Sequence, residues 1–372
     1  MGEGRIMVGE SARRARLAAL SLALAALLAA CGQSAQKPPQ SADSSSSSAP
    51  TASIEAQLDP CQDKAGLAQK VCQDPTLAPV AARIKEALAQ AAAGVSAEGD
   101  KLIVEGQRAW LEAQALECGV DAGKADAAEC LKTALDARVK EAAAAVEEKG
   151  GFVFQRVEVN QAAATTAEIA AASGLGADAP AAITRELRYP RIDNAGSAAA
   201  QKFNEIMAKM GQPRFKLEDA TTENTDYTIT FASPQLVSVQ FITTDYSLGA
   251  AHPNNGMTAV TVLMSEGRPL EAADVFKAGS GWEAFLTRRS LRTLTKTFAE
   301  FGAGAPETGD VRDTATKAHN WTIAEDGLVV LFPPYSVGPF ALGAHEVKIP
   351  WKDLAPYVNP NAPAPINAPK PS

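Results

Sequence analysis

Histidine is scarce in this sequence, and the motifs of the common enzyme classes are absent. The 372 residues include three histidines, His252, His319 and His345, and none stands in a metal-binding spacing such as His-Glu-x-x-His. The sequence has no Gly-x-Ser-x-Gly nucleophile elbow and no phosphate-binding P-loop. Carboxylates are plentiful, but one sequence does not show two of them converging on a substrate. We therefore expect no metal and no cofactor, and nothing in the sequence supports an enzyme.

Long apolar runs and a basic surplus are also missing beyond the first thirty residues. No stretch after Leu28 approaches the roughly 18 apolar residues of a membrane-spanning helix. The chain has 35 Lys and Arg against 43 Asp and Glu, a formal charge of −8, and loss of residues 1–30 removes four arginines and two glutamates, which leaves −10. Nucleic acid is not expected as a partner because its phosphates need basic patches. An acidic chain instead favours encounter with a cationic partner.

The residues before Cys31 explain why the sequence has an odd number of cysteines. Three arginines, Arg13, Arg14 and Arg16, precede the apolar run 17–28, which is too short for a mature membrane span and is typical of a signal-peptide core. The tetrapeptide Leu-Ala-Ala-Cys that ends at Cys31 resembles the lipobox of bacterial lipoproteins, which are cleaved directly before a diacylglyceryl-modified cysteine. The resemblance implies a signal peptide at 1–30 and a lipidated Cys31. The alternative is an ordinary cleaved signal with a stray cysteine nearby.

The rest of the chain divides by composition. Residues 31–53 are rich in Ser, Pro, Ala and Gln and predict a flexible tether. Residues 54–149 are Ala-rich, with apolar residues at helical spacing, for example Leu131, Leu135, Val139, Ala142 and Val146. Residues 150–358 contain strand-like segments, and the Pro-rich segment 359–372 is expected to be disordered. We predict two domains: a small disulfide-stapled all-α domain, followed by an α+β domain with an antiparallel sheet.

Alternating and β-branched segments predict the strands of the second domain. One amphipathic helix is expected at 198–210 and another near 282–301, and a turn at Asp326-Gly327 separates two late strands. The segments between 159 and 183 read as a loop or an extra helix. The expected strands are 152–159, 183–192, 226–233, 235–247, 257–264, the two halves of 320–332, and 345–351.

The four remaining cysteines predict disulfides. Cys61 and Cys72 are eleven residues apart and Cys118 and Cys130 twelve, far from the spacing of two to four that zinc ligands favour. Disulfides persist in an exported chain, and closing a loop of about twelve residues stabilises by roughly 3 kcal/mol on the chain-entropy model. The sequence allows three pairings. We favour Cys61–Cys72 with Cys118–Cys130, and a crossed pairing that joins the first and last helices remains possible.

The helical segment resembles the LprI-type lysozyme-inhibitor domain. The resemblance covers about 55–148 and rests on three stretches, "CQDPTLAPV", "GQRAWLEAQALEC" and "ECLKTALDAR". Lysozyme binding is what this resemblance implies. In the alternative interpretation Trp110 is a core residue, and Gln107 and Arg108 are a solvated turn of helix. The residues that match the family pattern are Cys72, Asp74, Pro75, Leu77, Gln107, Arg108, Trp110, Leu111, Cys118, Cys130, Leu131 and Arg138.

The second domain resembles the extracytoplasmic domain of RsiV-type anti-sigma factors, which bind lysozyme; the same domain is also found fused to peptidoglycan deacetylases. The resemblance covers roughly 150–358 and rests on "YPRI", "LGAAHPN", "EGRPLEAADVF" and "GLVVLFPPYSVGPFALGAHEVKIPWKDL". The family usually has Gly-Gly-Ala-His where this chain has Gly249-Ala250-Ala251-His252. An anti-sigma role is not carried over, because the chain has no predicted transmembrane helix or sigma-binding segment.

His252, Asn254 and Tyr335 are the candidate binding residues. His252 is followed by Pro253 and Asn254 at a predicted hairpin end, where asparagine supplies turn geometry. His252 therefore has two interpretations: it binds the loop backbone, or it contacts a partner. Tyr335 in "FPPYSVGPF" has the same two interpretations, since a tyrosine ring packs while its hydroxyl reaches the surface.

These observations favour a cell-envelope lipoprotein that binds and inhibits a lysozyme-like muramidase and so protects peptidoglycan. The alternative is a peptidoglycan-binding module for envelope maintenance without inhibitory activity; a hydrolase of unrecognised type is a third, unsupported possibility. We expect the lipid on Cys31 to be the membrane attachment. Gly32 and Gln33 follow it, and neither is the aspartate that commonly retains lipoproteins at the inner membrane, so in a two-membrane bacterium we expect the outer membrane, facing the periplasm or the surface.

The lipid anchor gives the first prediction. Mass spectrometry of the native protein should find a chain that begins at Cys31 and carries added acyl mass. The Cys31→Ala variant should accumulate as an unlipidated or uncleaved precursor. A mature form that begins elsewhere and carries no lipid would contradict the assignment.

Overall fold

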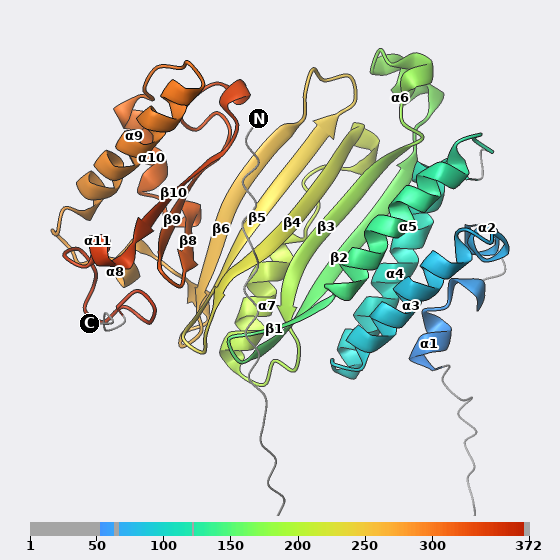
Figure 1. Cartoon of the computed structure of the whole chain (residues 1–372), viewed down its shortest axis with the longest axis horizontal. Helices are drawn as coiled ribbons and strands as arrows, with labels where there is room; N and C mark the ends of the chain where they lie inside the picture. The colour runs from blue at the N-terminus through green and yellow to red at the C-terminus, as the bar shows by residue number, and fades with distance from the viewer. Residues whose placement is uncertain (1–52, 63–66, 121–122, 368–372) are drawn as a thin grey trace, which may run out of the picture. The chain divides into compact units, whose positions relative to one another are not determined.

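The computed structural model describes residues 53–62, 67–120 and 123–367 (Figure 1). The predicted signal peptide, Cys31 and the tether up to residue 52 lie outside the described residues. All described residues belong to one compact unit. In the described part of the chain, no helix combines the length and the hydropathy needed to cross a membrane.

The helical region follows the predicted pattern. Val80, Ile84 and Leu88 line the buried face of α3, and Trp110 lies buried on α4 in the same core. Ser96 caps α4, because its hydroxyl accepts a hydrogen bond from the Gly99 amide at 3.2 Å. The helices are α1 (Ile54–Gln57), α2 (Leu67–Gln73), α3 (Ala78–Ala92), α4 (Ala97–Glu117) and α5 (Ala127–Ala143).

Two disulfides close this region, with the pairing that the sequence favoured. Cys61 is bonded to Cys72, which joins the short 3-10 turn Pro60–Gln62 to α2. Cys118 is bonded to Cys130, which joins the end of α4 to the first turn of α5. The prediction of a disulfide-stapled helical region is confirmed. Each bridge joins two elements that are neighbours along the chain.

A seven-stranded sheet follows, in the order β1-β2-β3-β4-β5-β6-β7. Every neighbouring pair is antiparallel except β3 and β4, which run parallel because α7 (Ala198–Met210) carries the chain back between them. The sheet is therefore mixed where we expected an antiparallel one. Its strands are β1 (Val146–Lys149), β2 (Phe152–Ala164), β3 (Ala182–Ile192), β4 (Thr221–Ala232), β5 (Leu236–Ser247), β6 (Asn254–Leu263) and β7 (Arg268–Pro269).

Helices cover opposite faces of this sheet. Phe154 of β2 packs against Phe203 of α7, with ring centroids 6.0 Å apart. The next residue, Gln155, donates to the Gly99 carbonyl of α4 at 2.7 Å. Because neighbouring side chains of a strand point to opposite faces, α7 and α4 lie on different sides of β2. The short helix α6 (Ala167–Ala172) lies in the connection between β2 and β3.

The C-terminal part builds a second, three-stranded antiparallel sheet in the order β10-β9-β8. Its core contains Phe276, Trp282 and Trp321; Phe276 stacks on Trp282 at 4.5 Å, and Trp321 meets both rings edge-on. In Figure 1 this part lies beside β6, and α3–α5 lie beside β2. The elements are α8 (Ala272–Val275), α9 (Trp282–Glu300), α10 (Thr308–Ala315), β8 (Trp321–Ala324), β9 (Gly327–Phe332), β10 (His345–Pro350) and α11 (Trp351–Leu354).

Two details differ from the sequence prediction. Val146 continues the helical spacing of α5, but the helix ends at Ala143 and Val146 begins β1, which pairs with β2. The tail is ordered as far as Asn367: Ile366 is buried, and the Ala364 amide donates to the Gln235 side chain at 2.8 Å. The segment 359–367 thus packs against the rest of the chain, whereas disorder of the whole tail stays a prediction. Composition suggested disorder, but Ala362 and Ile366 belong to the buried cluster of the C-terminal part.

The disulfides give the second prediction. Non-reducing peptide mapping should recover both local pairs with no free thiol. Because each bridge closes a loop of about twelve residues, its loss should lower the free energy of unfolding by about 3 kcal/mol on the chain-entropy model. After reduction, hydrogen exchange should speed up in α2 and α5 before it does in β4–β6. A crossed disulfide peptide, or equal loss of protection in both regions, would contradict this description.

Candidate functional site

An exposed aromatic cluster brings together two of the three predicted binding residues, His252 and Tyr335. The His252 ring stacks on Phe340 with centroids 4.0 Å apart and an interplanar angle of 14°. The Tyr335 ring lies 5.5 Å from the same phenylalanine, and its hydroxyl is 3.4 Å from His252 Nε2. His252 lies in the β5–β6 loop, whereas Tyr335 and Phe340 lie between β9 and β10. We call these three residues the aromatic cluster.

The backbone presents Tyr335 to solvent. The residue has a φ of +67°, in the left-handed region that side chains other than glycine rarely adopt, and 59% of its surface is exposed. Such a backbone conformation costs free energy, so the surrounding loop must hold it in place. The loop holds this conformation in part through Ser336, whose hydroxyl and amide both donate to the Pro333 carbonyl.

His252 binds the loop backbone, the first of the two interpretations that the sequence left open, and contact with a partner stays a prediction. Its Nδ1 is 2.9 Å from the Pro253 carbonyl, and a carbonyl only accepts, so Nδ1 carries the proton in the neutral ring. Nε2 is then an acceptor for the Tyr335 hydroxyl. Asn254 does not join the cluster through a hydrogen bond; its amide donates to Asp245 across the hairpin at 3.4 Å. Asn254 thus supports the hairpin that carries His252.

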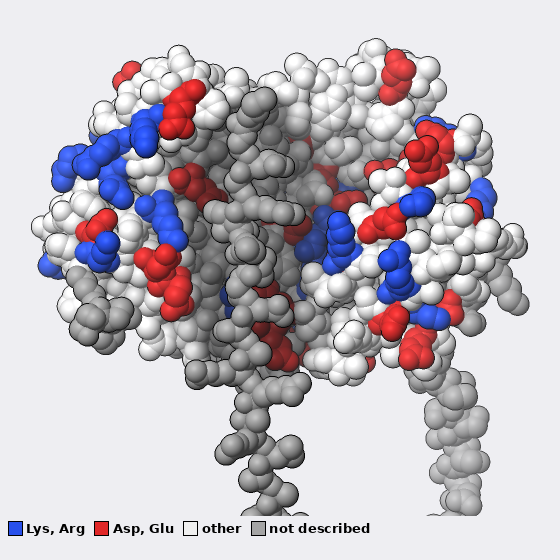
Figure 2. All heavy atoms as spheres, in the orientation of Figure 1, with Lys and Arg blue, Asp and Glu red and all other residues white. Residues whose placement is uncertain are grey.

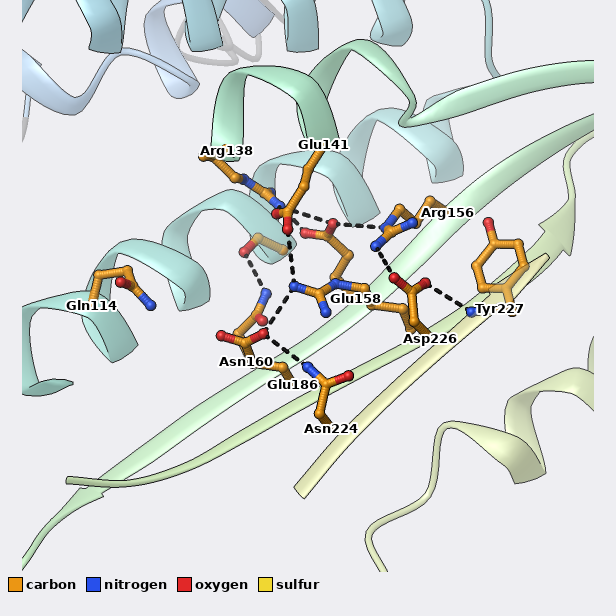
Figure 3. A network of polar contacts seen from close by, with 12 residues as sticks. Gln114, Arg138, Glu141, Arg156, Glu158, Asn160, Glu186, Asn224, Asp226 and Tyr227 are labelled. Carbon is orange, nitrogen blue, oxygen red and sulfur yellow. Dashed lines mark hydrogen bonds and ion pairs between the residues drawn. The ribbon is translucent and has the colours of Figure 1, made fainter. Parts of the chain in front are cut away.

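A buried ion network lies between the helices and the sheet, and sequence reasoning missed it (Figure 3). Arg138 of α5 binds Glu158 of β2 through two hydrogen bonds of 2.8 and 2.7 Å, with side chains 3% and 9% exposed. Gln107 accepts from Arg138 Nε at 3.0 Å, and the guanidinium lies 5.2 Å from the Trp110 ring centroid. Gln107 is buried, which corrects the interpretation of 107–108 as a solvated turn; Arg108 is exposed and Trp110 is core, as expected.

The network continues across the sheet. In Figure 3, Arg156 reaches from Glu158 to Asp226, and Glu141 of α5 lies over the strands. Further contacts join Glu141 to Arg138 and Arg188, and Glu186 to Arg188 and Asn224. The members come from α5, β2, β3 and β4. Cationic and anionic side chains alternate through the network. Their ion pairs fix the four elements relative to one another.

The electrostatics of Glu158 are those of a permanent ion pair. Burial would raise the pKa of its carboxyl, but Arg138, with help from Arg156 and Arg188, outweighs burial and holds the pKa below its usual range. For Arg138, burial acts to lower the pKa, and Glu158 and Glu141 raise it beyond its ordinary value. Neither group exchanges protons near neutral pH. Both shifts favour the charged pair, which supports a structural role for Arg138 and Glu158.

An open acidic pocket of about 530 Å³ lies beside the network. Among the described residues, its only lining cation is Arg188, which is already paired with Glu141 and Glu186. Burial, together with the nearby charge of Glu186, raises the pKa of Glu117, although a hydrogen bond from Gln114 opposes the shift. The lining residues are Trp110, Gln114, Glu117, Asp126, Glu129, Cys130, Thr133, Ala134, Ala137, Glu141, Glu186 and Arg188. No group of three or more metal-binding side chains suited to an ion occurs among the described residues.

Residues 273–352 match the model of a family described as a protein of unknown function, DUF3298. We refer to this matched segment, residues 273–352, as the DUF3298 domain. The domain runs from α8 to the start of α11 and contains Tyr335 and Phe340, while His252 lies outside it. The aromatic cluster therefore forms where the DUF3298 domain meets the β5–β6 hairpin.

Two solved structures are similar to this chain. A member of the DUF3298 family from Bacteroides fragilis has 16% identity and a TM-score of 0.40, over 58% of this chain and 96% of that one. A DUF3298 family protein from Pseudomonas aeruginosa has 13% identity and a TM-score of 0.41, over 56% and 95%. No curated protein matches the chain.

The buried pair gives the third prediction. Glu158→Gln should destabilise the protein by about 3 kcal/mol in chemical denaturation, because the buried Arg138 would lose the carboxylate that binds it through two hydrogen bonds and keep only the more exposed Glu141. The exposed Glu105→Gln on α4 is the control and should change stability little.

The same variant predicts the response to acid. Because the folded pKa of Glu158 is lowered, its contribution is complete above the unfolded pKa of about 4.3 and is lost as pH falls towards the folded value. The wild type should therefore lose more stability than Glu158→Gln as the pH drops below about 4.3. Parallel pH profiles for the two proteins would contradict the assignment.

Proposed function

We propose that this chain is an envelope lipoprotein that binds and inhibits a lysozyme-like muramidase, and that the aromatic cluster is part of the contact surface. The observation that carries the proposal is the convergence of Tyr335, His252 and Phe340 from loops about eighty residues apart. Tyrosine is enriched among the residues that dominate binding energy in protein interfaces. Tyr335 is fixed by its loop and lies against Phe340, whose ring stacks on His252. Its side chain therefore loses little conformational entropy on binding.

The resemblances of the two regions support the choice of partner. Residues 54–149 resemble the LprI-type lysozyme-inhibitor domain, and the DUF3298 domain is compatible with the RsiV-type resemblance of the region that follows. Both families include members that interact with lysozyme. One shared target explains the presence of the two regions in one chain more simply than coincidence does.

Charge supports a cationic partner. The chain has a formal charge of −8, and the pocket beside Trp110 presents Glu117, Glu141 and Glu186 around one arginine. Complementary fields speed encounter and suppress wrong partners, although they contribute less to affinity. We assign specificity to the aromatic cluster and encounter to the acidic surface.

A glycan-binding role is the alternative function. Aromatic rings present apolar faces on which a sugar ring can pack, and the Tyr335 ring belongs to a residue that is 59% exposed. Peptidoglycan binding without inhibition would therefore use the same residues. Sedimentation with purified sacculi distinguishes this function, because a muramidase-binding protein needs the enzyme in order to be retained.

Replacement of Tyr335 gives the fourth prediction. The soluble chain that starts at Gly32 contains every described residue, and it should bind a c-type lysozyme and reduce its muramidase activity. Tyr335→Asn should weaken binding about tenfold or more, since loss of a central aromatic contact costs about 1–2 kcal/mol or more. Asparagine is chosen because it tolerates a positive φ, which keeps the loop conformation accessible.

Phe301→Ala is the matched control, because Phe301 is 66% exposed at the end of α9 and takes no part in the ring contacts of the cluster. It should leave affinity within about twofold of wild type. Affinity should fall only moderately between about 50 and 200 mM salt, and an equally basic protein without muramidase activity should not compete. Equal effects of Tyr335→Asn and Phe301→Ala, or competition by the basic protein, would contradict the proposal.

A further inference from the structure

Basic side chains gather over α9, at the left of Figure 2, although the chain as a whole is acidic. Arg288, Arg292 and Lys296 follow one another at intervals of four residues and therefore share one face of the helix. All three are exposed. Like charges at this spacing destabilise a helix, so the arrangement costs stability unless an anion lies between them.

Three arginines of this helix line one hollow of about 370 Å³, which we call the arginine pocket. Its lining residues are Phe285, Arg288, Arg289, Arg292 and Asp353. Phe285 stacks on Tyr357 with centroids 4.7 Å apart and gives the pocket a fixed apolar wall. Asp353 is the single acid in the lining, so the pocket has a formal charge of +2 (three arginines and one aspartate).

The donors of the arginine pocket are largely unused. The contact between Arg289 and Asp353 is long, at 4.0 Å, and the buried Arg289 Nε has no hydrogen-bond partner. Arg288 and Arg292 form no ion pair within residues 53–62, 67–120 and 123–367, which the structure describes. Apart from Arg108, every other described arginine forms an ion pair. Unpaired guanidinium groups thus concentrate at one hollow.

We propose that the arginine pocket binds the phosphate group of an anionic ligand. A guanidinium presents a planar fork of N–H donors that matches phosphate oxygens in pairs, and phosphate has enough oxygens for several such forks. A phosphate monoester carries close to two negative charges at neutral pH, which balances the pocket. Binding would also relieve the repulsion between Arg288 and Arg292. This site is separate from the aromatic cluster and does not depend on muramidase binding.

Two sources present this chemistry: a phospholipid headgroup in a bilayer and a soluble phosphate compound. Two probes distinguish them, inorganic pyrophosphate in calorimetry and vesicles that contain phosphatidic acid, whose headgroup is a phosphate monoester, in co-sedimentation, with phosphatidylcholine vesicles as the neutral reference. Because the chain has a net charge of −8, general attraction to an anionic surface is not expected, and retention would report the local pocket.

The test uses the chain from Gly32 onward and the double variant Arg288→Gln/Arg292→Gln. We expect wild type to bind at least one of the two probes and the variant to bind it about tenfold more weakly or worse, because charge-assisted hydrogen bonds are lost. The melting temperature should stay the same or rise, since the replaced residues are exposed, unpaired and mutually repulsive. Binding of vesicles alone assigns a lipid headgroup, and binding of pyrophosphate assigns a soluble phosphate compound.

The matched control is Arg108→Gln/Lys209→Gln, which removes two exposed basic residues from α4 and α7 and makes the same change in net charge. It should bind like wild type. The proposal is overturned if wild type binds neither probe, or if the control variant loses as much affinity as the pocket variant.

Discussion

The buried ion pair between Arg138 and Glu158 is the contact on which the position of the helical region depends. Loss of either residue would leave the other buried charge with one remaining partner, Glu141 at 3.1 Å for Arg138 or Arg156 at 3.4 Å for Glu158, so α5 has one favourable position on β2. Gln155 and Asn160 of the same strand donate to carbonyl groups of α4 at 2.7 and 3.4 Å, which fixes a second helix. Ser96, at the start of α4, donates to the buried Asp193 twice at 2.6 Å. The division into two domains at residue 150 stays a prediction, but these satisfied polar contacts give the two regions a specific interface.

The acidic pocket, the aromatic cluster and the arginine pocket depend on this interface to different degrees. The acidic pocket exists only while α5 lies against β3, because its walls come from both. The aromatic cluster needs the β5–β6 hairpin to meet the DUF3298 domain, and that junction is supported by the buried Ser238, which accepts from the Ile323 amide of β8 at 3.0 Å. The arginine pocket is local to α9 and α11. Loss of the ion pair should therefore disturb the acidic pocket first and the arginine pocket last.

Much of the fold was predictable, since local patterns carry it: the helix 198–210, the strand near 183–192 and the local disulfide pairs agree with the structure. The sequence contains one indication of the ion pair. Arg138 falls on the apolar stripe of Leu131, Leu135 and Ala142, where a charge must find a buried partner. Its partner Glu158 lies on a strand. The periodicity of a helix or a strand does not indicate which residue of the strand will lie against a given residue of the helix. The contact between His252 and Tyr335 and the parallel pairing of β3 with β4 are non-local for the same reason.

The central claim is that the helical region and the sheet are joined through Arg138 and Glu158. Native-state hydrogen exchange of α5 and β2 in wild type and in Arg138→Met tests it most directly, because methionine keeps apolar packing and removes the charge. The account predicts that the most protected amides of α5 and β2 open with the same free energy in wild type, and that the variant lowers both by the same amount. If β2 kept its wild-type protection in the variant while α5 lost its own, the claim would be contradicted.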